Sequence, residues 1–355
     1  MTYLSQYTDS RNNNFNLVRF LAASLVIFSH SYPLIGELEP LKSLTGKSLG
    51  GLAVDIFFIS SGFLICRSFV KRPSLMDFSI SRMLRIYPAL IVAVVFCTFL
   101  VGLNYTSFPI IEYLTSTETY SYLIRNSLLV TGIQHTLPGV FESLPFSGAV
   151  NGSLWTLPYE IAMYTAIVIL LLVSTKVSTS VGIDRKWGIL AATIVILLKY
   201  LTDTYMTGTS SHSTSLSLMF LSGSSYYMFR DKIYMSWIAF SVSFSLLVVT
   251  GLSSDLFNVL YPILIPYIVL FIAYIPKGRI LKFNHFGDYS YGIYIYAFPI
   301  QQIIVFHNKD ISAFTLTALA FPATLALAYL SWHLIEEKAL KLKSRLIKAG
   351  AYKAC

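Results

Sequence analysis

The chain has 355 residues, of which 55% are hydrophobic and only 12% are charged, whereas charged residues make up about a quarter of soluble domains. A soluble domain of this length could not bury so much apolar surface, but a lipid bilayer accepts it directly. The formal net charge is +9, yet the sequence has no basic stripe with interleaved aromatic residues of the kind that binds nucleic acid. The composition excludes a water-soluble protein and indicates a polytopic membrane protein.

Apolar windows of about 20 residues recur along the chain, and each is long enough to cross the ~30 Å hydrocarbon core of a bilayer. The fifth and sixth windows are the weakest, because Lys199 lies in one and the other is rich in serine. We therefore expect an all-α membrane protein with about ten transmembrane helices. The windows are residues 16–33, 51–69, 86–103, 152–173, 187–203, 212–229, 233–251, 256–275, 286–306 and 312–334.

The basic residues are divided unequally between the two sides that ten spans would define. With both termini on one side, 21 of the 26 Lys and Arg residues fall on that side. The positive-inside rule then places both termini in the cytosol. The last window is followed by a basic cytosolic tail at about residues 335–355. The first window is not a cleaved signal peptide, because it carries His30 and no small-residue cleavage site follows it.

Residues 104–151 are the longest stretch outside the apolar windows. They contain a short amphipathic piece around residues 122–133 and a run rich in proline and glycine from 137 to 152. We expect an outer loop with a segment lying against the membrane surface, so that residues 1–355 form a single membrane domain. Cys66, Cys97 and Cys355 lie far apart, make no metal-ligand spacing and are expected to be free thiols.

Two basic residues of the first window are spaced to share a helix face. Arg19 and His30 are eleven residues apart, which is about 16 Å along a helix and within about 20° of the same face. Because an ionisable group inside a membrane costs several kcal/mol, each is a functional candidate. The structural alternative is an arginine that reaches the interface and a histidine hydrogen-bonded to a neighbouring carbonyl.

Arg82 and Arg85 are three residues apart at the cytosolic entrance of the third window, so their guanidinium groups share one helix face. Each guanidinium presents a planar pair of N–H donors, and two adjacent ones suit a phosphate or pyrophosphate. The alternative is an orientation signal that faces lipid headgroups.

Two carboxylates fall inside predicted spans. Asp55 lies near the outer end of the second window, where a purely structural ion pair is a strong alternative. Glu160 lies about 12 Å from the outer end of the fourth window. Burying a carboxylate at that depth costs free energy, and a purely structural role does not readily explain it.

The motifs around these residues, taken together and in order, resemble the membrane acyltransferase family 3, ten-helix O-acyltransferases that modify bacterial surface polysaccharides. One position departs from many members of that family, which have a histidine where Ala297 precedes Phe298 and Pro299. The matching motifs are Asn16-Leu17-Val18-Arg19 with ten residues between Arg19 and His30; Val54-Asp55 through Gly62-Phe63; Arg82-x-x-Arg85-Ile86-Tyr87-Pro88; Ser153-Leu154-Trp155 through Glu160; Gly287-Asp288 through Tyr294; and Trp332 to Glu336.

The resemblance implies an enzyme of the bacterial inner membrane that moves an acyl group, most often acetyl, from cytosolic acyl-CoA to a hydroxyl of a lipid-linked or cell-surface sugar. Acyl-CoA, the sugar acceptor and membrane lipids would be its partners, with no permanently bound cofactor, no metal and no nucleic acid. Arg82, Arg85 and Arg19 would hold the phosphates of CoA at the cytosolic side.

His30 would then be the general base for the acceptor hydroxyl, and either Glu160 or Asp55 would orient its imidazole. No appended soluble domain is present, so the membrane part must act alone. The alternative from another class is a transporter or flippase of a polyprenyl-linked sugar, which would also need intramembrane arginine, histidine and glutamate. Against it, the sequence shows no internal repeat and no paired broken helices. A non-catalytic assembly factor would not explain the arginine pair.

Overall fold

The computed structural model describes residues 2–10 and 12–343, and 77% of the structure is helical. Helices dominate because a bilayer offers backbone groups no water, so apolar segments must satisfy their hydrogen bonds internally. Two short antiparallel strands, β1 (Thr2–Tyr3) and β2 (Tyr234–Met235), pair Thr2 with Met235 and Tyr3 with Tyr234.

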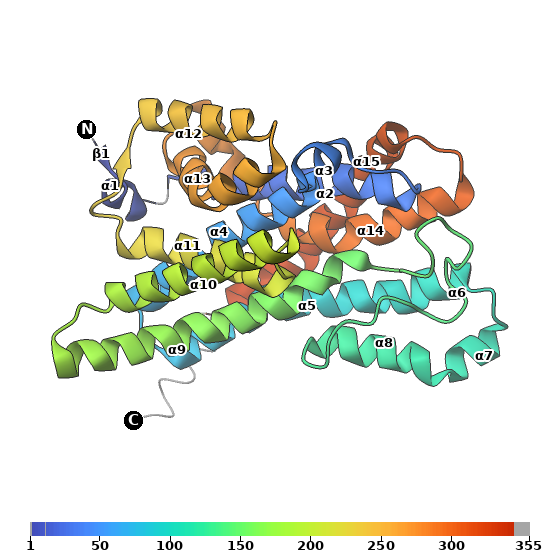
Figure 1. Cartoon of the computed structure of the whole chain (residues 1–355). Coiled ribbons are helices and arrows are strands. Elements are labelled where there is room, and N and C mark those ends of the chain that lie inside the picture. Colours follow the sequence, from blue (N-terminus) through green and yellow to red (C-terminus); the bar gives the residue numbers. More distant parts are fainter. Residues whose placement is uncertain (1, 11, 344–355) are drawn as a thin grey trace, which may run out of the picture. The chain divides into compact units, whose positions relative to one another are not determined.

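The helices follow one another along the chain as Figure 1 shows. They are α1 (Ser5–Thr8), α2 (Phe15–Leu34), α3 (Pro40–Thr45), α4 (Leu49–Lys71), α5 (Leu75–Val95), the π-helix η1 (Phe96–Val101), α6 (Gly102–Tyr105), α7 (Ile110–Thr115), α8 (Thr117–Leu128), the 3-10 helix η2 (Gly152–Thr156), α9 (Leu157–Val181), α10 (Lys186–Thr207), α11 (His212–Met228), α12 (Trp237–Thr250), α13 (Ser254–Tyr274), the 3-10 helix η3 (Arg279–His285), α14 (Ser290–His307), α15 (Ala313–Ser331) and the π-helix η4 (Trp332–Glu336).

Seven helices within the described residues are long and apolar enough to cross a bilayer. Each of the ten predicted windows lies on a helix, but α11 with 17 residues and α12 with 14 are only about 26 and 21 Å long. Helix α14 has 18 residues, and two adjacent glutamines lower its hydropathy. The seven are Phe15–Leu34, Leu49–Lys71, Leu75–Tyr105, Gly152–Val181, Lys186–Thr207, Ser254–Tyr274 and Ala313–Lys343.

The chain is therefore an all-α, multi-pass membrane protein, as the composition predicts. The number of ten spans and the cytosolic side of the termini remain predictions. The predicted basic tail continues beyond residue 343, so most of it, and Cys355, lie outside the described residues.

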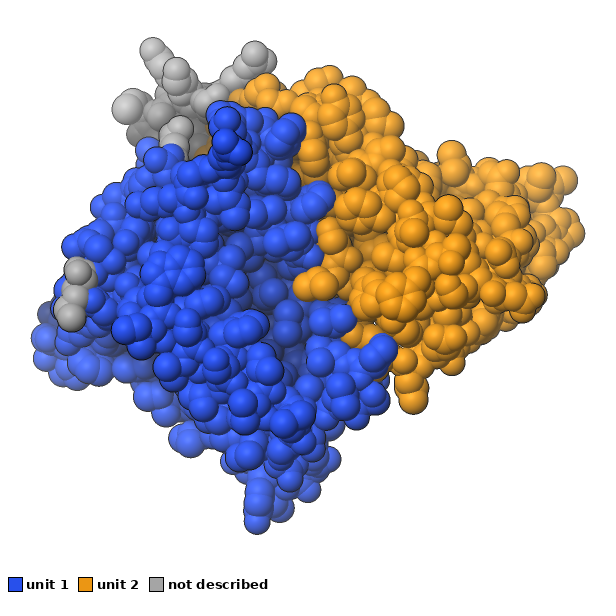
Figure 2. Space-filling view, turned by 90° about the horizontal axis from the view of Figure 1, so that it is seen from above, with its two compact units in different colours: residues 1–22, 40–72, 159–287 blue, residues 23–39, 73–158, 288–355 orange. Residues whose placement is uncertain are grey.

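The helices divide into two compact units (Figure 2). Unit 1 comprises residues 1–22, 40–72 and 159–287, and unit 2 comprises residues 23–39, 73–158 and 288–355. Two helices belong to both units: α2 changes unit after Ala22, and α9 changes unit after Pro158. Arg19 and His30 are thus carried by one helix but belong to different units.

In unit 1, helices α4 and α11 pack with their backbones in contact. A Cβ atom at Gly62 would overlap the backbone of Phe220, and one at Gly223 would overlap the carbonyl of Ile59. Ser224 reinforces the approach, because its Oγ donates a hydrogen bond to the carbonyl oxygen of Gly62 at 3.0 Å. Small residues permit this closeness, and it replaces the hydrophobic effect as a source of stability between helices in lipid.

In unit 2, helix α14 forms the core. Most of its residues are buried, including both glutamines. A Cβ atom at Gly292 would meet the backbone of Ala328 on α15, so these two helices also approach closely. The remaining elements of the unit contact α14 through the hydrogen bonds described with the site below.

Residues 104–151, which we expect as an outer loop, fold back along the helices of unit 2. Tyr113 donates a hydrogen bond to the carbonyl of Thr98 at 2.6 Å, and Tyr87 donates one to the carbonyl of Leu128 at 3.3 Å. Tyr113 belongs to α7 and Leu128 to α8. Because Tyr87 and Thr98 are eleven residues apart, α7 and α8 together run beside α5 and η1 over about 16 Å, as Figure 1 shows.

The rest of this segment is irregular but buried. Its apolar side chains are less than 9% exposed at positions that include Leu137, Val140, Phe141 and Val150. Its backbone finds partners inside the protein, for example in the hydrogen bond from the Val150 N–H to the His135 carbonyl at 2.8 Å. Irregular backbone is tolerated among membrane helices only when protein groups satisfy it in this way.

Helix α8 is amphipathic. Tyr120, Ile124 and Leu128 lie four residues apart and form an exposed apolar face, while Tyr122 and Asn126 on the opposite side are fully buried. The expected contact of this region with the membrane surface stays a prediction, and the exposed face is the part of α8 that would make it.

Replacing Gly62 by alanine should destabilise unit 1 by about 1–3 kcal/mol, because the added methyl group must displace backbone atoms of α11. The matched control is Gly51→Ala in the same helix, where the nearest atom to a Cβ is the flexible Ser48 Oγ at 3.3 Å. Thermal unfolding of the detergent-purified proteins compares the midpoints of Gly62→Ala and Gly51→Ala with that of the wild type. Equal midpoints for Gly62→Ala and the wild type would contradict the close packing of α4 and α11.

Candidate functional site

His30 lies in the part of α2 that belongs to unit 2. Its Nδ1 is buried and has no hydrogen-bond partner among the described residues. The ring of Phe298 on α14 packs edge-on against the imidazole, with 5.4 Å between ring centroids, and in turn contacts Phe146 at 5.8 Å. A histidine nitrogen that is buried among apolar groups and makes no hydrogen bond is available to accept a proton.

The serines on either side of this histidine are engaged elsewhere, as expected from the helix geometry. Ser29 donates to the Glu39 carboxylate at 3.2 Å, and Ser31 is 2.8 Å from the Thr317 hydroxyl of α15. The side-chain amide of Gln301 on α14 also donates to Ser31 at 2.8 Å. These bonds fasten α2 to both neighbouring helices, so neither serine is placed as a nucleophile for the histidine to activate.

The segment that leads into α9 is held against the same side of unit 2. The Asn151 amide donates to the carbonyl of Ile295 on α14 at 2.8 Å, and the next residue, Gly152, lies so close to the Phe298 ring that a Cβ atom would overlap it. The side-chain amide of Gln302 donates to the Ala149 carbonyl at 2.8 Å. Helix α14 thus holds both the histidine-bearing helix and the start of η2.

Arg85 lies in α5 and is bound by two carboxylates of unit 2. Its Nη2 is 2.5 Å from Asp288 and its Nη1 is 3.6 Å from Glu336, and all three side chains are largely buried. The guanidinium also lies 5.8 Å from the Trp332 ring centroid and 6.0 Å from that of Tyr291. An incoming phosphate would have to displace these carboxylates, so the arrangement supports a structural role. Its predicted contact with acyl-CoA stays a prediction.

The other two predicted phosphate ligands have aromatic neighbours. The Arg82 guanidinium lies 6.0 Å from the ring centroid of Phe78, one turn earlier on α5 in unit 2. The Arg19 guanidinium lies 5.7 Å from the Phe57 ring centroid in unit 1. Arginine side chains stack on aromatic rings and bind phosphates through a planar pair of N–H groups, and the contact of Arg82 and Arg19 with acyl-CoA stays a prediction.

Asp55 is part of a buried cluster in unit 1. Its carboxylate is 2.5 Å from the Lys47 ammonium and accepts a hydrogen bond from the Tyr261 hydroxyl at 2.8 Å. The same ammonium lies 4.6 Å from the Tyr261 ring centroid. The cluster ties the loop before α4 to α13, and it matches the structural ion pair that the sequence analysis left open for Asp55.

Glu160 lies in the first turn of α9, and its carboxylate accepts a hydrogen bond from the Tyr164 hydroxyl one turn later. A carboxylate in the first turn of a helix is stabilised by the helix dipole. The sequence places Glu160 about 12 Å from the outer end of a span. Gly152, at the start of the helical segment that carries Glu160, packs on Phe298 near the middle of α14, and the depth of Glu160 in the membrane stays a prediction.

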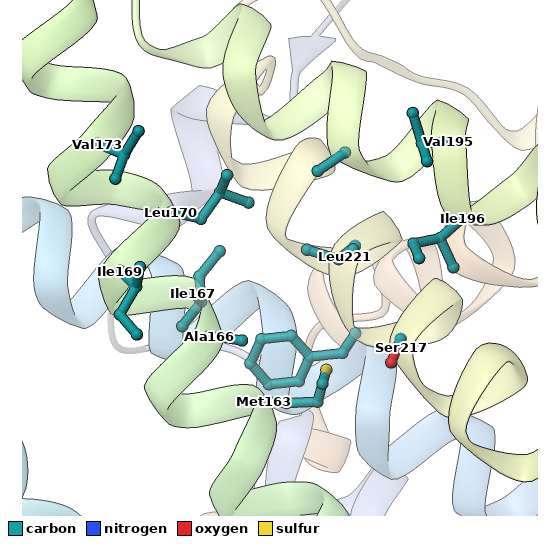
Figure 3. Close-up of a pocket in the computed structure, with 12 residues that line it drawn as sticks. Met163, Ala166, Ile167, Ile169, Leu170, Val173, Val195, Ile196, Ser217 and Leu221 are labelled. Carbon is teal, nitrogen blue, oxygen red and sulfur yellow. The ribbon is translucent and has the colours of Figure 1, made fainter.

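An apolar cavity of about 610 Å³ lies among α9, α10 and α11 in unit 1. Figure 3 shows aliphatic side chains of the three helices pointing into it, among them Leu170, Ile196 and Leu221. It adjoins the Glu160 region, because Phe220 lines the cavity and is 6.2 Å from the Tyr164 ring centroid. Ser217 supplies the one hydroxyl group of its lining.

Sequence reasoning missed the polar residues that organise unit 2. The adjacent Gln301 and Gln302 were a usable signal, since two amides inside an apolar window require partners. Asp288 and Glu336 entered only through the family motifs, and nothing in their spacing linked them to Arg85. Among residues 2–10 and 12–343, no group of three His, Cys, Asp or Glu side chains is arranged to hold a metal ion.

Replacing Arg85 by methionine should lower the stability of the protein by about 3–5 kcal/mol, because it leaves two buried carboxylates without their countercharge. The control is Lys71→Met, which removes an exposed ion pair with Asp9 and should cost less than about 1 kcal/mol. Thermal unfolding in detergent compares the two. If Arg85→Met unfolds at the wild-type temperature, the Asp288 and Glu336 contacts are not a structural element.

Comparison with known proteins identifies the family. The family model described as an acyltransferase domain matches residues 12–333. The chain is similar to an O-acetyl transferase of Shigella phage Sf6, 30% identical over 352 residues that cover 94% of this chain and 98% of the phage protein. It is also similar to Nodulation protein 10 of Rhizobium leguminosarum bv. viciae, 28% identical over 381 residues that cover 97% of each. No solved structure matches the chain. The motif-based prediction is thereby confirmed, and the chain belongs to the membrane acyltransferase family 3.

Proposed function

We propose that this protein is an O-acyltransferase of the bacterial inner membrane that moves an acetyl group from cytosolic acetyl-CoA to a hydroxyl of a lipid-linked or cell-surface sugar. The observation that carries the proposal is the environment of His30: a buried imidazole nitrogen without a partner among the described residues, in a chain whose residues 12–333 match an acyltransferase family. The O-acetyl transferase name of the phage relative supports the choice of acetyl and of an oxygen acceptor.

His30 acts as the general base. It takes the proton of the acceptor hydroxyl as that oxygen attacks the thioester carbonyl, and it returns the proton to the departing CoA thiolate. Positioned proton transfer of this kind contributes typically 10²–10⁴-fold to rate. Glu160 or Asp55 would orient the imidazole, and their partners Tyr164 and Lys47 show that each carboxylate also has a structural bond.

The acyl group passes directly from CoA to the acceptor. Cys66 and Cys97 are buried and free, and both serines beside the histidine are hydrogen-bonded to other groups. A covalent intermediate needs a nucleophile within hydrogen-bond reach of its base. The arrangement therefore supports a single displacement.

The donor would be held by its phosphates. Arg82, Arg85 and Arg19 are the candidates for this role, and Arg85 is also engaged by Asp288 and Glu336. Arg19 lies on the helix that carries His30 and would contribute from the cytosolic end of that helix, so the pantetheine arm would carry the thioester along α2 toward the histidine.

The acceptor would carry a hydrocarbon anchor. The cavity of about 610 Å³ among α9, α10 and α11 is lined almost entirely by aliphatic groups on membrane helices. Such a surface suits an isoprenoid or acyl chain, because only apolar groups gain from leaving water or lipid for it. Phe220 of its lining contacts the ring of Tyr164, the partner of Glu160, so the cavity adjoins one of the candidate site residues within unit 1.

Replacing His30 by alanine should abolish acetyl transfer while expression and membrane insertion are retained. The control is His285→Ala, since His285 is exposed at the end of η3. The assay follows free CoA thiol released when an acceptor sugar lipid is added to purified protein and acetyl-CoA. A flippase would release no CoA. A His30→Ala variant that keeps more than about a tenth of the wild-type rate would remove His30 from the base role.

Replacing Arg82 by alanine should weaken acetyl-CoA binding by about 1.5–3 kcal/mol, which is the value of a hydrogen bond to a charged group. Arg82→Lys should recover only part of this loss, because an ammonium cannot form the planar fork. Calorimetric titration at two salt concentrations measures the acetyl-CoA affinity of the detergent-purified wild type, Arg82→Ala and Arg82→Lys. Three equal affinities would show that Arg82 serves only to orient the protein in the membrane.

A further inference from the structure

Ser153 is a buried hydroxyl that the proposed mechanism does not use. The residue is fully buried, and its Oγ has no hydrogen-bond partner among the described residues. Burying a hydroxyl without a partner costs free energy, and an alanine of similar size would avoid that cost. What distinguishes Ser153 from other buried hydroxyl groups of unit 2 is that its neighbour, Gly152, packs on the Phe298 ring that also contacts His30.

Ser153 lies in the first turn of a long helix. The 3-10 helix η2 continues directly into α9, so that Gly152–Val181 forms a 30-residue helical segment. The Asn151 side chain caps it by accepting a hydrogen bond from the Ser153 N–H at 3.2 Å. The first N–H groups of a helix and its dipole together favour negative charge at this end.

This helix start and His30 meet at one level of α14. The Phe298 ring contacts the imidazole and also leaves no room for a Cβ atom at Gly152. Phe298 is the ninth residue of the 18-residue α14, about 12 Å from either end of that helix. Two polar atoms without partners among the described residues, His30 Nδ1 and Ser153 Oγ, therefore belong to a residue that contacts this ring and to the neighbour of one that does.

The chemistry of acyl transfer requires negative charge to be stabilised beside the base. When the acceptor oxygen attacks the thioester, the carbonyl oxygen becomes an oxyanion, which donors fixed in a water-poor site stabilise strongly. We propose that Ser153 donates its hydroxyl hydrogen to this oxyanion and that the amino-terminal end of the η2–α9 helix supplies the surrounding positive field. The inference rests on the proposed acyl transfer and adds a catalytic residue to it.

The reaction steps balance without any further reagent. His30 removes the acceptor proton as the new carbon–oxygen bond forms, and the charge on the carbonyl oxygen is held by Ser153. The carbon–sulfur bond then breaks, the carbonyl re-forms, and the histidine proton passes to the CoA thiolate. Ser153 keeps its own proton throughout.

A nucleophilic role for Ser153 is the chemical rival. A serine nucleophile is hydrogen-bonded to its base, whereas the Ser153 hydroxyl and the His30 Nδ1 each lack a hydrogen bond within the described part of the chain. The structure therefore favours an oxyanion donor over an acyl-serine.

The test measures kcat and KM for acetyl-CoA, with acceptor present, for Ser153→Ala, Ser153→Cys and the control Thr324→Val. Thr324 is a second fully buried hydroxyl of unit 2 without a partner among the described residues, and it lies on α15. Loss of an oxyanion donor should lower kcat about 10²–10³-fold and leave KM within about two-fold. Ser153→Cys, a weaker donor of similar size, should fall between, and Thr324→Val should match the wild type.

Mass spectrometry of each protein, incubated with acetyl-CoA but without acceptor, should find no acetyl group on Ser153. A Ser153→Ala variant whose kcat stays within about three-fold of the wild type would overturn the inference while leaving the proposed function intact. An acetylated Ser153 would overturn the inference and direct transfer from CoA, while leaving acetyl transfer itself intact. If Ser153→Ala does not fold, the kcat of Ser153→Cys decides by the same criterion. A wild-type protein that releases no CoA would instead refute the proposed function, and the inference with it.

Discussion

A bilayer supplies no hydrogen bonds, so every polar group placed among membrane helices must find its partner inside the protein. Unit 2 is organised by this constraint. The side-chain amides of Gln301 and Gln302 donate to the helix that carries His30 and to the segment that leads into η2, respectively. The Asn151 amide adds a third bond to α14. A few amide groups thus position the helix and the helix start that carry the candidate catalytic residues.

The same constraint separates structural polar residues from functional ones. Asp55 and Arg85 are charged and buried, but each is matched by groups of opposite charge and by an aromatic ring within its own unit. Such clusters stabilise helix packing whether or not chemistry follows. His30 and Ser153 differ, because each retains a buried polar atom that no described residue satisfies.

Much of the fold was predictable from the sequence, because the length and composition of apolar windows respond directly to the bilayer. All ten windows fall on helices, and the motifs, taken together and in order, identified the family. The course of residues 104–151 was not predictable, since proline, glycine and polar residues are typical of exposed loops. Here Gln302 satisfies the Ala149 carbonyl of this segment, and the Asn151 side chain donates to the Ile295 carbonyl of α14, so both bonds join residues about 150 positions apart in the sequence.

The roles of individual residues were likewise predictable where they depend on local spacing and not predictable where they depend on distant contacts. The spacing of Arg82 and Arg85 places them on one helix face, but it carries no information on Asp288 and Glu336, which the fold brings to Arg85 from more than 200 residues away. Lys47 lies only eight residues before Asp55, so the pairing of the two is a local contact. The sequence analysis left a structural ion pair open for Asp55.

The return of residues 135–151 against α14 also sets an order for biogenesis. Ribosomes add about 5–20 residues per second, so helix α14 is completed roughly 8–30 s after the segment that it must satisfy. During that interval the carbonyls of Phe146 and Ala149 lack the Gln302 amide, and Asn151 lacks Ile295. We therefore expect this segment to complete its hydrogen bonds only after α14 has been made, which makes assembly of the candidate site in unit 2 a late step of folding.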